Sequence, residues 1–151
     1  MGAEATPAAE ISPEMVEQAE ALLEAARYDD LEDLKGLASG GVSLDAKDSQ
    51  GRTALHMAAA NGNHGIVEYL ISKGVDLNAL NDEKNTPLHW ACLNGHIEVV
   101  KTLILAGANV STLNSHERTP IDEALSKGKM DMLDAINAAV AQLELAGANV
   151  S

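Results

Sequence analysis

The stretch TALHMAAANG (53–62) returns as TPLHWACLNG (86–95) further along the chain. A third copy begins with TPIDEA (119–124), at the same offset from the second copy as the second has from the first. In the other direction, LLEAA (22–26) aligns with LHMAA of the first copy, again at this offset. The chain is therefore built from a 33-residue unit that occurs four times, at about 15–47, 48–80, 81–113 and 114–146.

Each unit predicts a pair of α-helices. Threonine stands where a helix N-cap is expected in three of the units, and proline follows it in two of them, at the first helical position: Thr53, Thr86, Thr119, Pro87 and Pro120. The first helix then ends before a glycine, which is able to adopt the left-handed conformation, as in Asn61-Gly62. The second helix shows apolar spacings of three and four residues. Because one pair cannot cover its own apolar faces, the units must stack, and the predicted fold is all-α.

The heptad LAGANVS occurs at 105–111 and again at 145–151, which is further apart than one period. We interpret the seven extra residues as about two additional turns on the last helix. An apolar stripe at spacings of three and four supports this extension: Met130, Leu133, Ile136, Val140 and Leu143. The alternative is that the sequence stops where a fifth unit would begin.

Both ends of the stack are expected to be polar caps. Residues 1–14 are expected to form a flexible acidic tail, and Ser12-Pro13 opens an acidic helix running to about Tyr28. At the other end, Asp122 and Glu123 fall in the first turn of a helix, where acids are favoured, and are expected to make its inner face polar.

The net charge of -13 is concentrated near the N-terminus, since residues 1–35 hold ten acids against Arg27 and Lys35. Such a field repels nucleic acid and anionic lipid and attracts basic proteins, although it also serves solubility alone. No apolar run is long enough for a membrane span, and no signal peptide is expected at the acidic start. The single Cys fits a reducing compartment, so we expect a cytoplasmic or nuclear protein, or one found in both.

The sequence contains no constellation typical of an active site. His89 and Cys92 form H-x-x-C, but zinc requires four converging ligands and no second pair exists. The segment GLASGG (36–41) lacks the lysine of a phosphate-binding loop. We expect no enzyme activity, cofactor or metal. MGAEAT (1–6) matches the N-myristoylation pattern at Gly2, but one acyl chain beside acids anchors only marginally.

Thr-Pro-Leu-His at 86–89, with Ala91 and Gly95 after it, resembles an ankyrin repeat, which has this period and this pattern. The resemblance covers nearly all of the chain beyond the first dozen residues. It implies one domain, 15–151, that forms an ankyrin-repeat solenoid of about four helix-turn-helix repeats with polar terminal caps. It also implies that His56 and His89 make structural hydrogen bonds within and between repeats.

The resemblance places protein binding on the turn tips and on the exposed positions of each first helix. The matching residues are Arg52, Met57, Asn61, Asp82, Glu83, Asn85, Trp90, Leu93, Asn94, His116 and Arg118. Trp90 is the strongest candidate for an anchor, because aromatic residues dominate interface energetics; the alternative is that it is half-buried between repeats. The stripe of Glu17, Glu20 and Glu24 is expected to steer a basic partner electrostatically.

Three groups of ankyrin proteins are similar in particular respects. The size and acidic N-terminal helix resemble small acidic ankyrin chaperones for a basic small-subunit ribosomal protein. Residues 40–56 and 83–89 resemble the ankyrin part of plant cytosolic envelope-targeting factors, and four small repeats resemble inhibitors of cyclin-dependent kinases. We expect a monomeric chaperone or adaptor that holds a basic client in its concave groove. The alternative is a regulatory subunit or inhibitor of an enzyme such as a protein kinase.

Overall fold

The computed structural model describes residues 12–147, which form eight α-helices and no β-strand. In chain order the helices are α1 (Pro13–Arg27), α2 (Leu31–Ser39), α3 (Ala54–Asn61), α4 (His64–Ser72), α5 (Pro87–Leu93), α6 (Ile97–Leu105), α7 (Pro120–Ser126) and α8 (Asp131–Leu145). The predicted all-α fold is confirmed. Gly2, most of the predicted tail and the last four residues of the second heptad lie outside the described residues.

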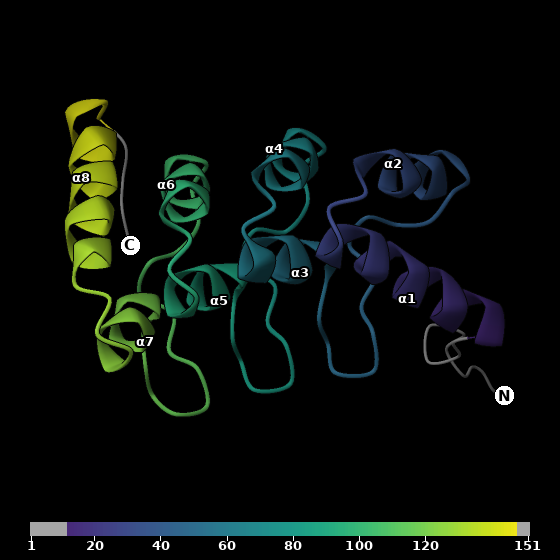
Figure 1. Ribbon diagram of the computed structural model, residues 1–151, viewed down its shortest axis with the longest axis horizontal. Helices are drawn as coiled ribbons and strands as arrows, with labels where there is room; N and C mark the ends of the chain where they lie inside the picture. The colour runs from purple at the N-terminus through teal and green to yellow at the C-terminus, as the bar shows by residue number, and fades with distance from the viewer. Residues whose placement is uncertain (1–11, 148–151) are drawn as a thin grey trace, which may run out of the picture.

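The helices form two rows. Helices α1, α3, α5 and α7 lie side by side in the first row, and α2, α4, α6 and α8 lie in the second (Figure 1). The turns that join one pair to the next project together from the first row (Figure 1). This is the solenoid that the repeat period predicts, because each helix pair meets only its neighbours.

Local capping explains why α3, α5 and α7 in the first row are short. At the start of α3, the Thr53 side chain accepts a hydrogen bond from the His56 N–H at 3.3 Å. After its end, Gly62 has a φ of 71°, in the left-handed region that a side chain disfavours. Gly95 and Gly128 end the equivalent helices with φ values of 78° and 73°. The predicted helix limits are therefore confirmed.

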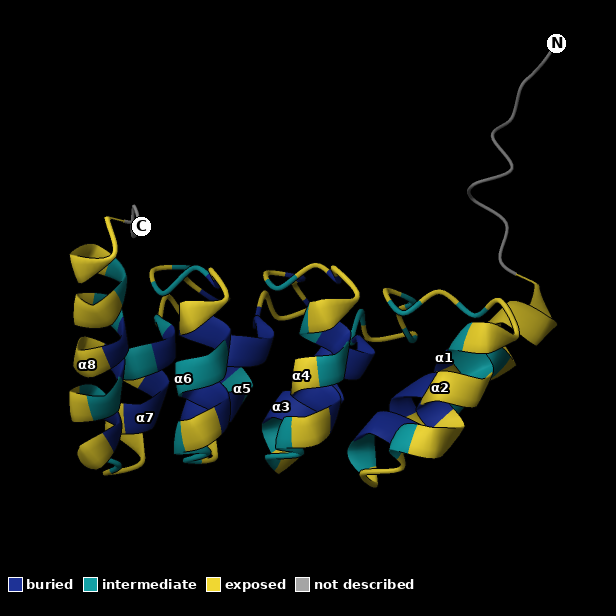
Figure 2. Cartoon of the chain, turned by 90° about the horizontal axis from the view of Figure 1, so that it is seen from above, coloured by how far each residue is buried: buried dark blue, intermediate teal, exposed yellow. Residues whose placement is uncertain are grey.

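The core lies between the two rows, where the buried faces of paired helices meet (Figure 2). Leu22, Leu55 and Leu88, which occupy the same position in successive units, are almost completely buried. Small residues such as Ala58 and Ala91 are also fully buried and let the first-row helices approach closely. A core of small aliphatic side chains therefore suits this thin structure.

Helix α8 has 15 residues against 9 in α6, and it is followed by Gly147 with a φ of 81°. The predicted lengthening of the last helix is confirmed. The predicted stripe is only partly correct. Met130 precedes the helix and is 62% exposed, whereas Met132 and Ala139 join Ile136 in the core. The remaining predicted members lie at the margin: Leu133, Val140 and Leu143.

Helix α1 also has 15 residues, against 8 in α3. It begins at Pro13, where the Ser12 hydroxyl accepts from the Met15 N–H at 3.1 Å, so the tail boundary predicted at residue 14 falls inside the helix. The first residues of α1 correspond, one period earlier, to residues that form a turn in the next unit. Within residues 12–147, no helix combines the length and apolarity needed to cross a membrane.

Candidate protein-binding surface

The three projecting turns share one side-chain arrangement. Asp48, Asn81 and Asn114 occupy the same position in successive units, and a side-chain oxygen of each accepts two backbone N–H bonds from within its own turn. In the middle turn, Asn81 Oδ1 accepts from Glu83 and Asn85, both at 2.9 Å. This arrangement was not predicted, although Asp or Asn at one fixed position of the period is a sequence signal for it.

Backbone hydrogen bonds join neighbouring turns. Asp82 N–H donates to the Gln50 carbonyl at 2.9 Å, and Ser115 N–H donates to the Glu83 carbonyl at the same distance. Each tip is therefore held by the tip beside it, so side chains on adjacent turns keep a defined spacing.

His56 links two repeats. Thr53 N–H donates to His56 Nδ1 at 3.1 Å, and His56 Nε2 lies 2.8 Å from the Asn85 carbonyl. A carbonyl only accepts, so Nε2 carries the proton and the ring is neutral. Burial lowers the pKa of His56 to about 4. His89 repeats the arrangement with Thr86 and the Arg118 carbonyl, and burial lowers its pKa as well. Both histidines therefore have the structural role that the resemblance implies.

Three hollows follow one another along the first-row helices and the turns. The first lies between α1 and the first turn, and its lining includes Glu20, Glu24 and Arg52. The second, which we call the Trp90 hollow, has a volume of about 340 Å³ and is lined by Gln50, Arg52, Asn81, Asp82, Glu83 and Trp90. The third lies on the other side of Trp90 and includes Glu83, Leu93, His116, Arg118 and Lys127. Because consecutive hollows share residues, they adjoin one another, and we call this row of three hollows the groove.

Most of the predicted binding residues border this groove. Those that line a hollow are Arg52, Asp82, Glu83, Asn85, Trp90, Leu93, His116 and Arg118. Glu20 and Glu24 line its first part, and Glu17 is exposed one turn away on α1. Asn61 and Asn94 are exposed, but their amides donate to the carbonyls of Met57 and Ala60.

Two predicted residues offer a partner little surface. Met57 is only 4% exposed, because the Arg27 guanidinium lies over it with Nη2 3.4 Å from the sulfur. Asn85 is 7% exposed, and its side-chain oxygen accepts from Asn114 Nδ2 at 2.9 Å. Contacts with the neighbouring unit bury both residues.

Trp90 was considered either as an anchor for a partner or as a residue half-buried between repeats, and it has features of both. Its ring packs against His56, with centroids 5.3 Å apart and an interplanar angle of 69°, and the residue is half-buried. The same residue borders hollows on both sides. Trp90 is therefore held by the repeat and is still open to a partner.

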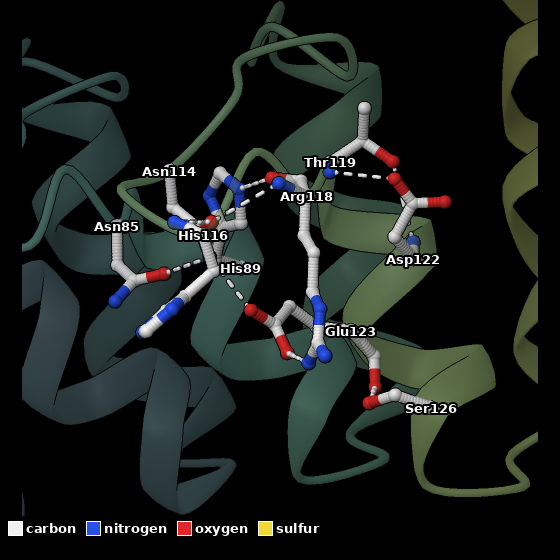
Figure 3. A network of polar contacts seen from close by, with 9 residues as sticks. All are labelled: Asn85, His89, Asn114, His116, Arg118, Thr119, Asp122, Glu123 and Ser126. Atoms are coloured by element: carbon white, nitrogen blue, oxygen red, sulfur yellow. Dashed lines mark hydrogen bonds and ion pairs between the residues drawn. The ribbon is translucent and has the colours of Figure 1, made fainter.

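A polar network lines the third hollow (Figure 3). Glu123 is 8% exposed, and its carboxylate accepts from Asn114 Nδ2 at 2.6 Å and pairs with the Arg118 guanidinium at 3.4 Å. Asp122 accepts from the Thr119 N–H at 2.9 Å and remains exposed. Of the two residues predicted to form a polar cap, only Asp122 faces solvent, because the preceding turn covers Glu123.

The described residues show no arrangement suited to metal binding. Within residues 12–147, no three His, Cys, Asp or Glu side chains are placed to hold an ion together. Cys92 is fully buried, and burial raises the pKa of its thiol to about 12. A thiol so protected is a poor nucleophile, because only the thiolate reacts.

Comparison with known proteins agrees with the geometry. A family model described as "Ankyrin repeats (3 copies)" matches residues 22–114. An L-asparaginase from Dirofilaria immitis is 49% identical over 47 residues, which are 31% of this chain and 8% of that protein. The chain thus spans under a tenth of that relative. The similarity is therefore no basis for assigning an enzymatic activity to this chain. This chain belongs to the ankyrin-repeat family, a family of protein–protein interaction modules.

Proposed function

We propose that this protein is a non-enzymatic chaperone or adaptor that holds a basic segment of a client protein in its groove. Eight exposed carboxylates on α1, α2 and the residues between them support a basic client, and only Arg27 and Lys35 oppose them. These acids are Glu14, Glu17, Glu20, Glu24, Asp29, Asp30, Glu32 and Asp33. Their field raises the encounter rate of a cationic partner and disfavours nucleic acid.

The observation that carries the proposal is the uneven neutralisation of charge in the groove. Arg52 is paired with Asp48 at 2.7 Å, and Arg118 with Glu123 at 3.4 Å. Asp82 and Glu83 are exposed, and no cation of residues 12–147 forms an ion pair with them. The central part of the groove therefore keeps free negative charge beside Trp90.

The test begins with affinity purification from a native lysate, using the wild type and a variant with Glu17, Glu20 and Glu24 changed to Gln. Recovery of a basic protein that falls with the Gln variant supports the proposal, and a basic small-subunit ribosomal protein would support the chaperone role. Recovery of a kinase instead would favour the alternative of an enzyme inhibitor. The client is then purified and its binding kinetics are measured.

In the kinetic assay, the Gln variant is expected to associate more slowly, and wild-type association is expected to weaken as salt rises. Trp90→Ala is expected to speed dissociation at every salt concentration, because it removes a contact made only in the complex. Association that is indifferent to both salt and the Gln substitutions would rule out a basic client. Melting curves of each variant control for unfolding, and size-exclusion chromatography tests the proposed monomer.

A further inference from the structure

We infer that the Trp90 hollow binds an arginine side chain of the partner, with the guanidinium beside the indole ring and within reach of the Asp82 and Glu83 carboxylates. This inference rests on the proposed function and names the group that the groove would recognise. It concerns one hollow and one side chain, so it can fail while the wider proposal stands.

The charges around the hollow favour a cation. The Arg52 guanidinium is held by the Asp48 carboxylate at 2.7 Å, and the Asp48 side chain is only 8% exposed. This pair is neutral overall, and the other two charged residues of the hollow, Asp82 and Glu83, form no ion pair within residues 12–147. Across Trp90, the neighbouring hollow contains Lys127, which forms no ion pair within the described part of the chain. A cationic ligand is therefore favoured on the Asp82 side.

The aromatic wall favours arginine in particular. The face of an indole carries partial negative charge and attracts cations, and arginine is the more frequent partner. Its planar guanidinium stacks on a ring while its N–H groups bond to carboxylates. This chain already contains cation–π contacts elsewhere, since Lys35 and Lys73 lie 5.5 Å and 5.6 Å from the centre of the Tyr69 ring.

The hollow is also held in place before any partner arrives. Asp82 N–H is bonded to the Gln50 carbonyl, and Glu83 N–H is bonded to Asn81 Oδ1, both at 2.9 Å. The packing of Trp90 against His56 orients the ring. Binding would then order little besides the two acidic side chains, which lowers its entropic cost.

The experiment uses the fluorescence of Trp90, because it is the single Trp of the chain. The whole protein is titrated with a capped Gly/Ser peptide that contains one arginine, and with the same peptide containing citrulline, which is nearly isosteric but neutral. The variants are Asp82→Asn and Glu83→Gln. The control is Glu68→Gln on α4, where the side chain is 61% exposed and an equal charge is removed from the second row of helices.

We expect a saturable change of Trp90 emission with the arginine peptide and none with the citrulline peptide. Each neutralised carboxylate is expected to weaken the apparent affinity about two- to fivefold, as for an exposed ion pair. Glu68→Gln is expected to bind as the wild type does. Melting curves confirm that the variants remain folded.

Three results would overturn the inference: an unchanged emission at millimolar arginine peptide, an equal response to citrulline, or equal weakening by Glu68→Gln and Glu83→Gln. The last would mean that only the general field of the protein acts. If a basic client binds while Trp90 emission stays constant, the proposed function survives and the arginine hollow is wrong. If no basic client binds, the proposed function itself fails.

Discussion

Each of the two terminal helix pairs contains one helix that is longer than any helix of the two central pairs. Helices α3 and α5 have 8 and 7 residues, and each is bounded by a capping box and a left-handed glycine. Helices α1 and α8 have 15 residues each. A central pair is packed on both sides, and the residues that precede α3 and α5 form the projecting turns. A terminal pair has one open side, where a helix can lengthen and present polar residues to water.

The same contrast holds for the caps. In α3 and α5 the histidine of the capping box also reaches a carbonyl of the next unit, Asn85 or Arg118. In α7 the equivalent residue is Asp122, which bonds only to Thr119 of its own box. The capping box is thus present in both central and terminal pairs. Only in the central pairs does its third residue, a histidine, also bond to a carbonyl of the next unit.

Replacing the third residue of a central and of a terminal capping box should give the largest difference in the free energy of unfolding. We expect His56→Ala to lower the free energy of unfolding by about 3–5 kcal/mol, since it opens a cavity and leaves buried groups unpaired. Asp122→Ala removes an exposed cap and should cost only about 1 kcal/mol. Urea denaturation of both variants measures this difference, and equal losses would show that the bond between repeats contributes little.

Lowering the pH should destabilise the central helix pairs through protonation of His56. The pKa of His56 is about 4 in the folded protein against an ordinary value of 6.5, so the unfolded chain binds more protons in this range. The contribution of this pKa difference to the free energy of unfolding is complete above pH 6.5 and is lost as pH falls towards 4. The loss amounts to about 3 kcal/mol. His89, with a lowered pKa, acts in the same direction. Denaturation across this range tests the prediction, and a flat profile would contradict it.

The glycines that end α3 and α5 allow the two central pairs to be compared with each other. A Cβ at Gly62 would lie 2.6 Å from Nδ1 of the His96 ring, whereas at Gly95 it would lie 3.0 Å from the Lys129 side chain, which can move. Both positions have positive φ. We expect Gly62→Val to cost roughly 3 kcal/mol and Gly95→Val roughly 1–2 kcal/mol. Thermal melting ranks the two, and the reverse order would show that His96 yields more easily than Lys129.

The smallest effect concerns two successive turns. Gly51 and Lys84 occupy the same position of the period with φ values of 75° and 63°, and only the second has a side chain. Lys84→Gly relieves the left-handed strain but raises the conformational entropy of the unfolded chain. We therefore expect the free energy of unfolding to rise by about 0.5 kcal/mol. Gly51→Ala should instead destabilise, because its Cβ would lie 3.2 Å from the backbone of Asn81. Melting temperatures shifting in the same direction for both variants would contradict this account.

The sequence by itself determined the architecture of this protein. The repeat period, the threonine caps and the glycines that end the helices are local signals, and they placed the helices of the central units close to their observed limits. The resemblance to ankyrin repeats placed Arg52, Glu83 and Trp90 on one surface. Local signals succeed here because each unit repeats the same few short-range interactions.

Only the tertiary structure decided which side chains of that surface remain available. Arg27 covers Met57, Asn114 bonds to Asn85, and the turn before α7 encloses Glu123. Each covering residue belongs to a different segment from the one it covers, and a periodic pattern gives the position of a residue within a unit but not its contacts with other segments. The charge of the groove was decided in the same way, because the free carboxylates of Asp82 and Glu83 become evident only once the neighbouring arginines are seen to be paired.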